Sequence, residues 1–272
     1  MKSKFYFVKC LTNLHMGSGD INFNVVDNEV QRDPVTGYPT MFSSGIKGAL
    51  REHFEDSHKD VTTDIFGSAI DKKKSDESQP GKLRFLTANM LLLPVRASAG
   101  SKLYFLVTTK TILRDFATMY ETINGRKVEF AEALQKLEDN KAYAAGTIHT
   151  AGIDGIEYSE TDHLKPIPDA IVKFFKAVAD TDKLLIVPDQ DARTLPLPVS
   201  ARNQLDNGIS QNLWYEEVVP HETVFYLAVL SNGTMPGDQA LESFDKVVKA
   251  DKLFQFGGNA TIGYGLTMLE EF

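Results

Sequence analysis

Near its end the chain carries the segment Gly257-Gly258-Asn259-Ala260-Thr261-Ile262-Gly263-Tyr264-Gly265, in which four of nine residues are glycine. Glycine permits positive φ values and lets another backbone approach closely. Two short apolar runs flank the segment, at residues 253–256 and 266–269, and we expect both to be strands. The spacing is not the dinucleotide-binding pattern. Two interpretations stay open: a nest of backbone N–H groups that binds phosphate, and a tight structural turn.

A second candidate phosphate site lies at residues 43–51. We expect a helix to begin at Ser43 and Ser44, because serine is a good N-cap and apolar residues follow at helical spacing. The start of a helix presents free N–H groups and the positive end of its dipole. Lys47 and Arg51 are four residues apart and share one helix face. The spacing is not that of a Walker A motif, and a capped helix with two solvated cations is the alternative.

The composition is that of a folded globular protein. Of the 272 residues, 42% are hydrophobic and 24% are charged, which suffices for one large domain or two small ones. The net charge of −8 argues against coating nucleic acid through bulk charge, but it allows a local positive track. The single cysteine, Cys10, fits a reducing cytoplasm. No apolar run reaches the ~18–20 residues of a membrane helix.

Helices and strands alternate at both ends of the chain, and the middle is irregular. Strands are predicted at residues 4–14, 83–95, 102–109, 184–188 and 223–230, and a helix near residues 237–249. The pattern of residues 112–182 predicts a helical insertion. Together these elements indicate an α+β sheet with helices on one face. We favour a split β-α-β core that the C-terminal segment completes.

A β-hairpin is predicted over residues 199–217. Asn207-Gly208 stands at its centre, and Asn-Gly is the strongest two-residue hairpin signal. Leu205 and Ile209 flank the tip and could wedge between bases, while Arg202 could meet a phosphate. The alternative is an ordinary hairpin with Leu205 and Ile209 in the core.

Together these segments resemble the RAMP superfamily of CRISPR proteins. The resemblance rests on segments spread along the whole chain: LHMGSG at 14–19, VVDNEVQR at 25–32, Tyr38-Pro39 leading into 43–51, IFG at 65–67, LWYEE at 213–217 and the glycine-rich segment at 257–265. Within the superfamily the combination is most similar to the repeated backbone subunit of the type III-B (Cmr) effector complex. Residues 25–32 and 213–217 are the most specific part, and residues 112–182 match no motif.

This resemblance implies a fold and a function. The fold would be a single domain with an RRM-like (ferredoxin-like) palm from residues 1–66, 82–111 and 217–272, inserted helical fingers at 112–182 and a thumb hairpin at 199–216. Copies of the subunit would form a filament along the CRISPR RNA with other Cmr subunits, in the cytoplasm and without a membrane. Target single-stranded RNA would be cut at regular intervals, where each thumb interrupts the pairing, in a metal-dependent reaction. No RNP1 pattern is present, so stacking of bases on the sheet is not expected.

By the same resemblance Asp27 is the leading catalytic residue and the candidate ligand for Mg²⁺ or Mn²⁺. RNA carries its own nucleophile, the 2′-OH, which A-form pairing keeps out of line with the leaving oxygen. A carboxylate could bind the metal at the phosphate or take the 2′-OH proton. One aspartate is a weak metal site, so phosphate oxygens and water would complete the shell. The alternative is an aspartate that caps a turn.

His15 and Glu216 are expected to support catalysis, again by motif match. An imidazole suits acid–base work near neutral pH, and the alternative is a histidine satisfied by neighbouring backbone. For Glu216 and its neighbour Glu217 the alternative is surface charge. Helix-start, thumb and glycine-loop residues are assigned to RNA binding: Ser43, Ser44, Lys47, Arg51, Arg202, Leu205, Ile209, Gly257, Gly258, Asn259, Thr261, Gly263 and Gly265.

Three competing functions stay open. A backbone subunit that binds RNA without cutting it would keep the RNA-binding segments and leave Asp27 inert. A metal-independent nuclease that processes CRISPR RNA would rely on a histidine base, and the Asp27 segment and the hairpin argue against it. A nucleotide-binding enzyme would need a Walker A or dinucleotide spacing that the sequence lacks.

Overall fold

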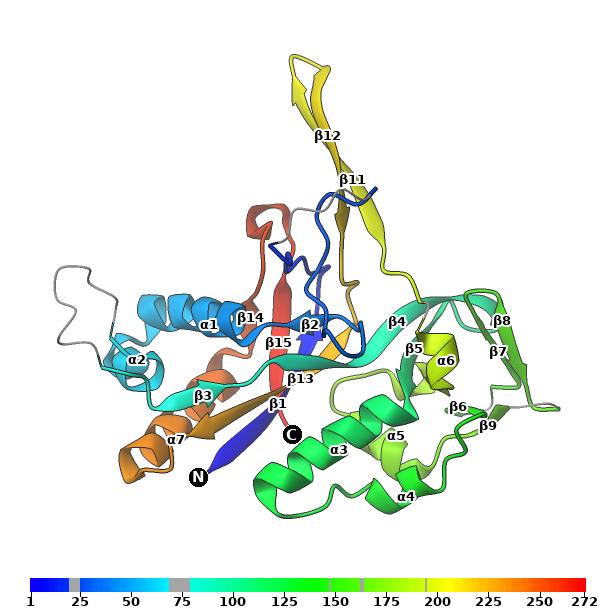
Figure 1. Ribbon diagram of the computed structural model, residues 1–272, viewed down its shortest axis with the longest axis horizontal. Helices are drawn as coiled ribbons and strands as arrows, with labels where there is room; N and C mark the ends of the chain where they lie inside the picture. Colours follow the sequence, from blue (N-terminus) through cyan, green and yellow to red (C-terminus); the bar gives the residue numbers. More distant parts are fainter. Residues whose placement is uncertain (20–24, 69–78, 147, 162–163, 194) are drawn as a thin grey trace. The chain divides into compact units, whose positions relative to one another are not determined.

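The computed structural model describes residues 1–19, 25–68, 79–146, 148–161, 164–193 and 195–272. These form two compact units (Figure 1). The first comprises Met1–Asn89, Pro198–Val219 and Tyr226–Phe272, and the second comprises Met90–Leu197 and Pro220–Phe225. Across the described ranges, no helix is both long enough and apolar enough to span a membrane.

The sheet of the first unit pairs the last strand of the chain with the first. Its order is β14-β15-β1-β13, with these bounds: β1 Ser3–Cys10, β13 Val224–Ser231, β14 Leu253–Gln255 and β15 Leu266–Glu271. β15 runs antiparallel to β1, which sets Val8 opposite Leu269. Two further short strands belong to this unit: β2 (Thr40–Met41), which pairs with Ala88 and Asn89, and β3 (Leu83–Phe85), which pairs with β13. A core completed by the C-terminal segment was predicted, and the β1–β15 pairing confirms that part.

Aromatic side chains join the helices of the first unit to its sheet. The helices are α1 (Ser43–Ser57), α2 (Lys59–Phe66) and α7 (Met235–Asp251). Phe54 of α1 stacks on Phe244 of α7 with ring centroids 5.6 Å apart. Tyr6 of β1 meets Phe244 edge-on, and its hydroxyl donates to Asp245. α1 and α7 therefore meet over the face of the sheet that carries Tyr6, and burial of these rings contributes much of the apolar stabilisation there.

The strands of the second unit follow the order β4-β5-β10-β6-β9. The bounds are β4 Ala88–Gly100, β5 Tyr104–Thr109, β6 Ala142–Ala144, β9 Leu164–Pro166 and β10 Leu184–Val187. A hairpin of β7 (Thr150–Ile153) and β8 (Ile156–Ser159) pairs with the end of β4. The described residues of this unit also form the α-helices α3 Lys110–Asn124, α4 Ala131–Gln135, α5 Asp169–Phe175 and α6 Asp189–Ala192.

The prediction of a helical insertion at residues 112–182 is therefore incomplete. α3, α4 and α5 lie there, but so do β6, β7, β8 and β9. Strands of three or four residues are too short to show a period-2 pattern. The turn between β7 and β8 is built by Asp154 at φ 47° and Gly155 at φ 80°. Asp-Gly is a known hairpin signal, so this hairpin was available from the sequence.

The hairpin predicted at residues 199–217 is confirmed. β11 (Val199–Asp206) pairs antiparallel with β12 (Ile209–Glu217), and it projects from the rest of its unit in Figure 1. Asn207 and Gly208 have φ of 49° and 83°, the positive values that a two-residue hairpin turn requires. Leu205 and Ile209 are 61% and 66% exposed, so the alternative that places them in the core is wrong.

Candidate functional site

Asp27 lies on an exposed loop that is fastened to the base of the hairpin. The backbone N–H groups of Asp27 and Asn28 both donate to the carbonyl of Tyr215. In return the N–H of Tyr215 donates to Oδ2 of Asp27 at 2.7 Å. The carboxylate of Asp27 thus accepts a hydrogen bond from a backbone N–H of β12. Residues 20–24, which precede this loop, lie outside the described residues.

Glu217 fixes the far side of the same loop. Its Oε2 accepts from the N–H of Val30 at 3.1 Å, and its Oε1 pairs with the guanidinium of Arg32. The side chain is buried, so these partners offset the cost of removing a carboxylate from water. Motif reasoning gave Glu217 no role, and its partners lie too far away in the sequence to be found by spacing.

Glu216 is 5% exposed, so the surface-charge alternative is wrong. The side-chain amide of Asn259 donates to both carboxylate oxygens at 3.0 Å. Nε of Arg202 donates to Oε2 at 3.1 Å, and its guanidinium lies over the ring of Tyr264. Nε2 of His15 lies 3.7 Å from Oε1. The structure thus brings His15, Arg202 and Asn259 together around the buried Glu216 as one polar cluster, here named the Glu216 cluster.

His15 is 8% exposed and faces protein groups on both ring nitrogens. Nδ1 lies 2.7 Å from the carbonyl oxygen of Glu217. A carbonyl oxygen only accepts, so Nδ1 carries the hydrogen of this bond. This geometry favours the alternative to a catalytic role, in which neighbouring backbone groups satisfy the hydrogen-bonding capacity of His15.

The helix expected at residues 43–51 is present as α1, but its serines do not cap it. The N-cap is Phe42, with no side-chain cap. Its carbonyl accepts from the N–H of Ile46, so the helix begins one residue earlier than a serine cap requires. Ser43 and Ser44 stand in the first turn, where Ser44 is exposed. Arg51 is directed to Glu55, at 2.6 Å, and this contact partly offsets its charge.

The glycine-rich segment uses several of its N–H groups within the protein. The donors with an internal carbonyl partner are Gly258, Ile262, Gly263, Tyr264 and Gly265. A nest that offers all its N–H groups to phosphate is therefore excluded. Gly265 has φ 78°, and a Cβ there would lie 1.9 Å from the carbonyl oxygen of Phe256, so only glycine fits. Thr261 and Gly263 remain exposed.

The start of α1 and the glycine-rich segment both lie close to the chain segment formed by His15 and Met16. A Cβ on Gly257 would lie 2.4 Å from the carbonyl oxygen of His15, and one on Gly45 would lie 2.9 Å from Cε of Met16. The N–H of Gly258 also donates to the carbonyl of His15. The start of α1, the glycine-rich loop and the Glu216 cluster are therefore neighbours in one region of the first unit.

Among the described residues, no ready-made set of protein metal ligands surrounds Asp27. In the part of the chain that the structure describes, three His, Cys, Asp or Glu residues with ligand atoms within 4.8 Å of one another occur only at His53, His58 and Asp251. A hard divalent cation is often held by one or two carboxylates plus phosphate oxygens and water. A single exposed carboxylate such as Asp27 fits an ion of that kind only if RNA and solvent were to supply most of its ligands.

The fold and site define an α+β protein with an exposed hairpin and a conformationally restricted glycine-rich loop. The sequence pattern of the RAMP superfamily matches residues 7–268, so the chain belongs to the RAMP superfamily. This confirms the resemblance found in the sequence.

Individual relatives agree with this assignment. The chain is 28% identical to the CRISPR system Cmr endoribonuclease Cmr4 of Pyrococcus furiosus, over 97% of this chain and 94% of that protein. A cryo-EM structure of the type III-B Cmr-beta complex bound to cognate target RNA contains a chain that superposes with a TM-score of 0.81 at 20% identity, covering 100% of this chain and 97% of that one. The crystal structure of oligomeric Cmr4 from Pyrococcus furiosus gives 0.74 at 20% identity, over 100% and 98%. These structural likenesses show a shared fold.

Proposed function

We propose that the chain is an RNA-binding backbone subunit of a type III-B effector complex and cleaves complementary target RNA, with Asp27 as its catalytic residue. One observation carries this proposal: Asp27 is exposed on a loop that is bonded to the base of an exposed hairpin. Similarity to a protein named a Cmr endoribonuclease over nearly the full length of both chains supports it.

The hairpin would prepare the target for cleavage. Leu205 and Ile209 present apolar surface to solvent at its tip, and apolar side chains can enter a base step and unstack it. A nucleotide displaced from an A-form duplex can turn its 2′-OH in line with the leaving 5′-oxygen. Because Asp27 bonds to Tyr215 of the same hairpin, the residue that cuts and the element that distorts the RNA would keep a fixed spacing.

Asp27 would act at the displaced nucleotide, either by accepting the 2′-OH proton or by holding Mg²⁺ or Mn²⁺ at the phosphate. The bound ion would supply charge stabilisation for the phosphorane-like transition state. His15 and Glu216 are then assigned to positioning, because their functional atoms face the protein interior. They would hold the hairpin base against the glycine-rich loop.

The start of α1 and the glycine-rich loop would bind the guide RNA. Backbone N–H groups of the uncapped first turn, together with Ser43, Ser44 and Lys47, offer donors to phosphate. Thr261 and the exposed glycines of the loop would approach the same strand. Since the chain carries a net charge of −8, we expect modest and salt-sensitive binding by one subunit, with affinity arising from adjacent copies.

The finer architecture belongs to the same proposal. The order β15-β1-β13, with α1 and α7 meeting over one face, supports a ferredoxin-like palm, and β11 with β12 would be its thumb. Expected partners are CRISPR RNA, target single-stranded RNA, other copies of the chain and other Cmr subunits, in the cytoplasm.

Replacement of the Asp27 side chain tests the catalytic assignment. In the complex reconstituted with guide RNA and Mg²⁺, Asp27→Ala should slow single-turnover target cleavage by ~10²-fold or more, with complex assembly and RNA binding unchanged. Asp139→Ala removes another exposed carboxylate and should cut at the normal rate. Full activity of Asp27→Ala would refute the assignment. Absence of cutting by the unaltered complex with every divalent ion would favour a subunit that binds without cleaving.

A further inference from the structure

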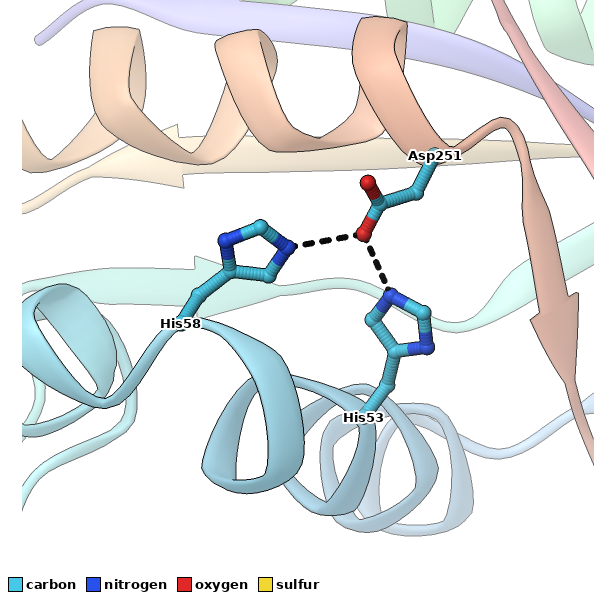
Figure 2. Close-up of side chains that lie close together, drawn as sticks. All are labelled: His53, His58 and Asp251. Atoms are coloured by element: carbon cyan, nitrogen blue, oxygen red, sulfur yellow. Dashed lines mark hydrogen bonds and ion pairs between the residues drawn. The ribbon is translucent and has the colours of Figure 1, made fainter.

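Two histidines and an aspartate meet at the end of α1 farthest from its RNA-binding start. His53 lies on α1, His58 is the residue that follows the helix, and Asp251 is the last residue of α7. Figure 2 shows both imidazole rings directed at one carboxylate oxygen. The Nε2 atoms of His53 and His58 lie 2.7 and 2.8 Å from Oδ2 of Asp251. All three residues belong to the first unit.

The surroundings of these side chains fix the rings while leaving their ligand atoms accessible. The ring of His53 packs against Phe254 with centroids 4.7 Å apart, and the ring of His58 packs against Phe54 at 5.5 Å. The side chains of His53, His58 and Asp251 are nevertheless 28%, 27% and 25% exposed. Water can therefore reach the cluster from one side, while the other side rests on aromatic core.

The chemistry of the three donors selects a class of ion. Two imidazole nitrogens and one carboxylate oxygen form the ligand set of Zn²⁺ and similar first-row metals, and Mg²⁺ prefers oxygen donors. The three ligand atoms all lie within 4.8 Å of one another. Neighbouring ligands of a tetrahedral zinc ion are roughly 3.4 Å apart, so small side-chain rotations would open the present contacts enough to admit an ion.

We propose that His53, His58 and Asp251 form a Zn²⁺-class binding site, with water as the fourth ligand, that clamps the end of α1 to the end of α7. The site is separate from the proposed RNA chemistry. Ser43 and His53 are ten residues apart on one helix, which is roughly 15 Å along its axis. The role of the ion is therefore structural, and it would hold α1 in place from its far end.

Metal binding by the purified full-length chain tests this proposal without RNA. After treatment with chelator, the protein should bind one equivalent of Zn²⁺ by isothermal titration calorimetry, and Co²⁺ should give the visible absorption of a tetrahedral site. Zn²⁺ should also raise the Tm, because an ion that binds only the folded chain stabilises it by mass action. His53→Gln and His58→Gln should each weaken Zn²⁺ binding at least about tenfold.

Asp251→Asn separates a metal site from a purely hydrogen-bonded clamp. The amide keeps an acceptor oxygen for both imidazoles but loses the charge that attracts a cation, so the fold should survive while Zn²⁺ binding and the rise in Tm are lost. His149→Gln is the matched control, since His149 is an exposed histidine beside Glu160, and it should bind Zn²⁺ normally.

Equal Zn²⁺ binding by the unaltered chain, Asp251→Asn and the double variant His53→Gln/His58→Gln would overturn the proposal, as would the absence of binding by the unaltered chain. A measurement of target RNA cleavage distinguishes failure of the proposed zinc site from failure of the proposed function. The reconstituted complex carrying Asp251→Asn should cut RNA in Mg²⁺ at the normal rate, whatever the outcome with Zn²⁺.

Discussion

Two carboxylates at the base of the hairpin lie in opposite surroundings. Asp27 is exposed on its loop and accepts a hydrogen bond from one backbone N–H. Glu216 is buried, and Arg202 and Asn259 occupy its oxygens. Both were predicted to be catalytic, since motif matching ranks residues by type and position. Their environments separate them: an exposed carboxylate with few partners can reach a substrate, and a buried one with several partners holds the fold.

His15 belongs with Glu216 in this comparison. Its Nδ1 bonds to the carbonyl of Glu217, and its own carbonyl accepts from Gly258. The cluster therefore connects the hairpin base, the segment after β1 and the glycine-rich loop. Replacement of a residue of the Glu216 cluster should therefore mainly lower the stability of the chain. Replacement of Asp27 should mainly slow RNA cleavage.

The largest expected effect on stability is that of Glu216→Gln. The amide keeps the shape of the side chain but leaves the partly buried guanidinium of Arg202 without its counter-charge, which should cost ~3 kcal/mol in the free energy of unfolding. Asp27→Asn keeps an acceptor at an exposed position and should cost less than ~0.5 kcal/mol. Urea unfolding followed by fluorescence suits the measurement, because Trp214 is the single tryptophan and lies on β12.

The comparison between Asp27 and Glu216 would fail if the two variants ranked in the opposite order of stability. If Asp27→Asn unfolded at much lower urea than Glu216→Gln, the exposed loop would be the structural element and the buried cluster would be dispensable. Single-turnover cleavage by the same two proteins in the complex sharpens the result. Asp27→Asn should retain RNA binding and lose cleavage. Glu216→Gln, once assembled into the complex, should lose less cleavage activity than Asp27→Asn.

Local chemistry explains which parts of the fold were predictable. The Asn207-Gly208 pair predicted the hairpin turn, and the helical spacing of apolar residues predicted α1, although not its N-cap. These signals lie within a few residues of one another. The burial of Glu216 was not predictable, since Asn259 is 43 positions away. The same holds for Glu217, whose partner Arg32 is 185 positions away. Such contacts depend on the tertiary fold and leave no mark in residue spacing.

An intermediate effect is expected at the tip of the hairpin. Leu205→Ser/Ile209→Ser removes the exposed apolar surface at the turn, and we expect target cleavage in the complex to slow by about tenfold, because unstacking a base step costs a few kcal/mol. Stability of the chain should change by less than ~0.5 kcal/mol. Cleavage kinetics and urea unfolding measure the two quantities.

Val35→Ser is the matched control for the hairpin tip. Val35 is 90% exposed and lies on a turn outside the hairpin, so its replacement should leave cleavage unchanged. A tip variant that cuts at the normal rate would show that the distortion of the RNA does not depend on these side chains. A tip variant that unfolds readily would show that they are buried within the free chain.

The smallest expected effect concerns Asp245, a third carboxylate, which is buried on α7. Burial alone would raise its pKa, but hydrogen bonds from Lys249, Tyr6 and Lys4 outweigh burial and lower the pKa below its ordinary value. A depressed pKa means that its contribution to stability is present above the pKa of the unfolded chain, ~3.9, and is lost as the pH falls through the lower folded value. Asp245→Asn should therefore lose less stability than the unaltered chain as the pH falls from 5 to 3, measured by urea midpoints. Glu242→Gln alters an exposed carboxylate of the same helix, and its stability should depend on pH as that of the unaltered chain does. If the stability of all three proteins fell equally with pH, the partners of Asp245 would not be lowering its pKa. The structural role inferred for Glu216, which is also a buried carboxylate with several partners, would then lose support.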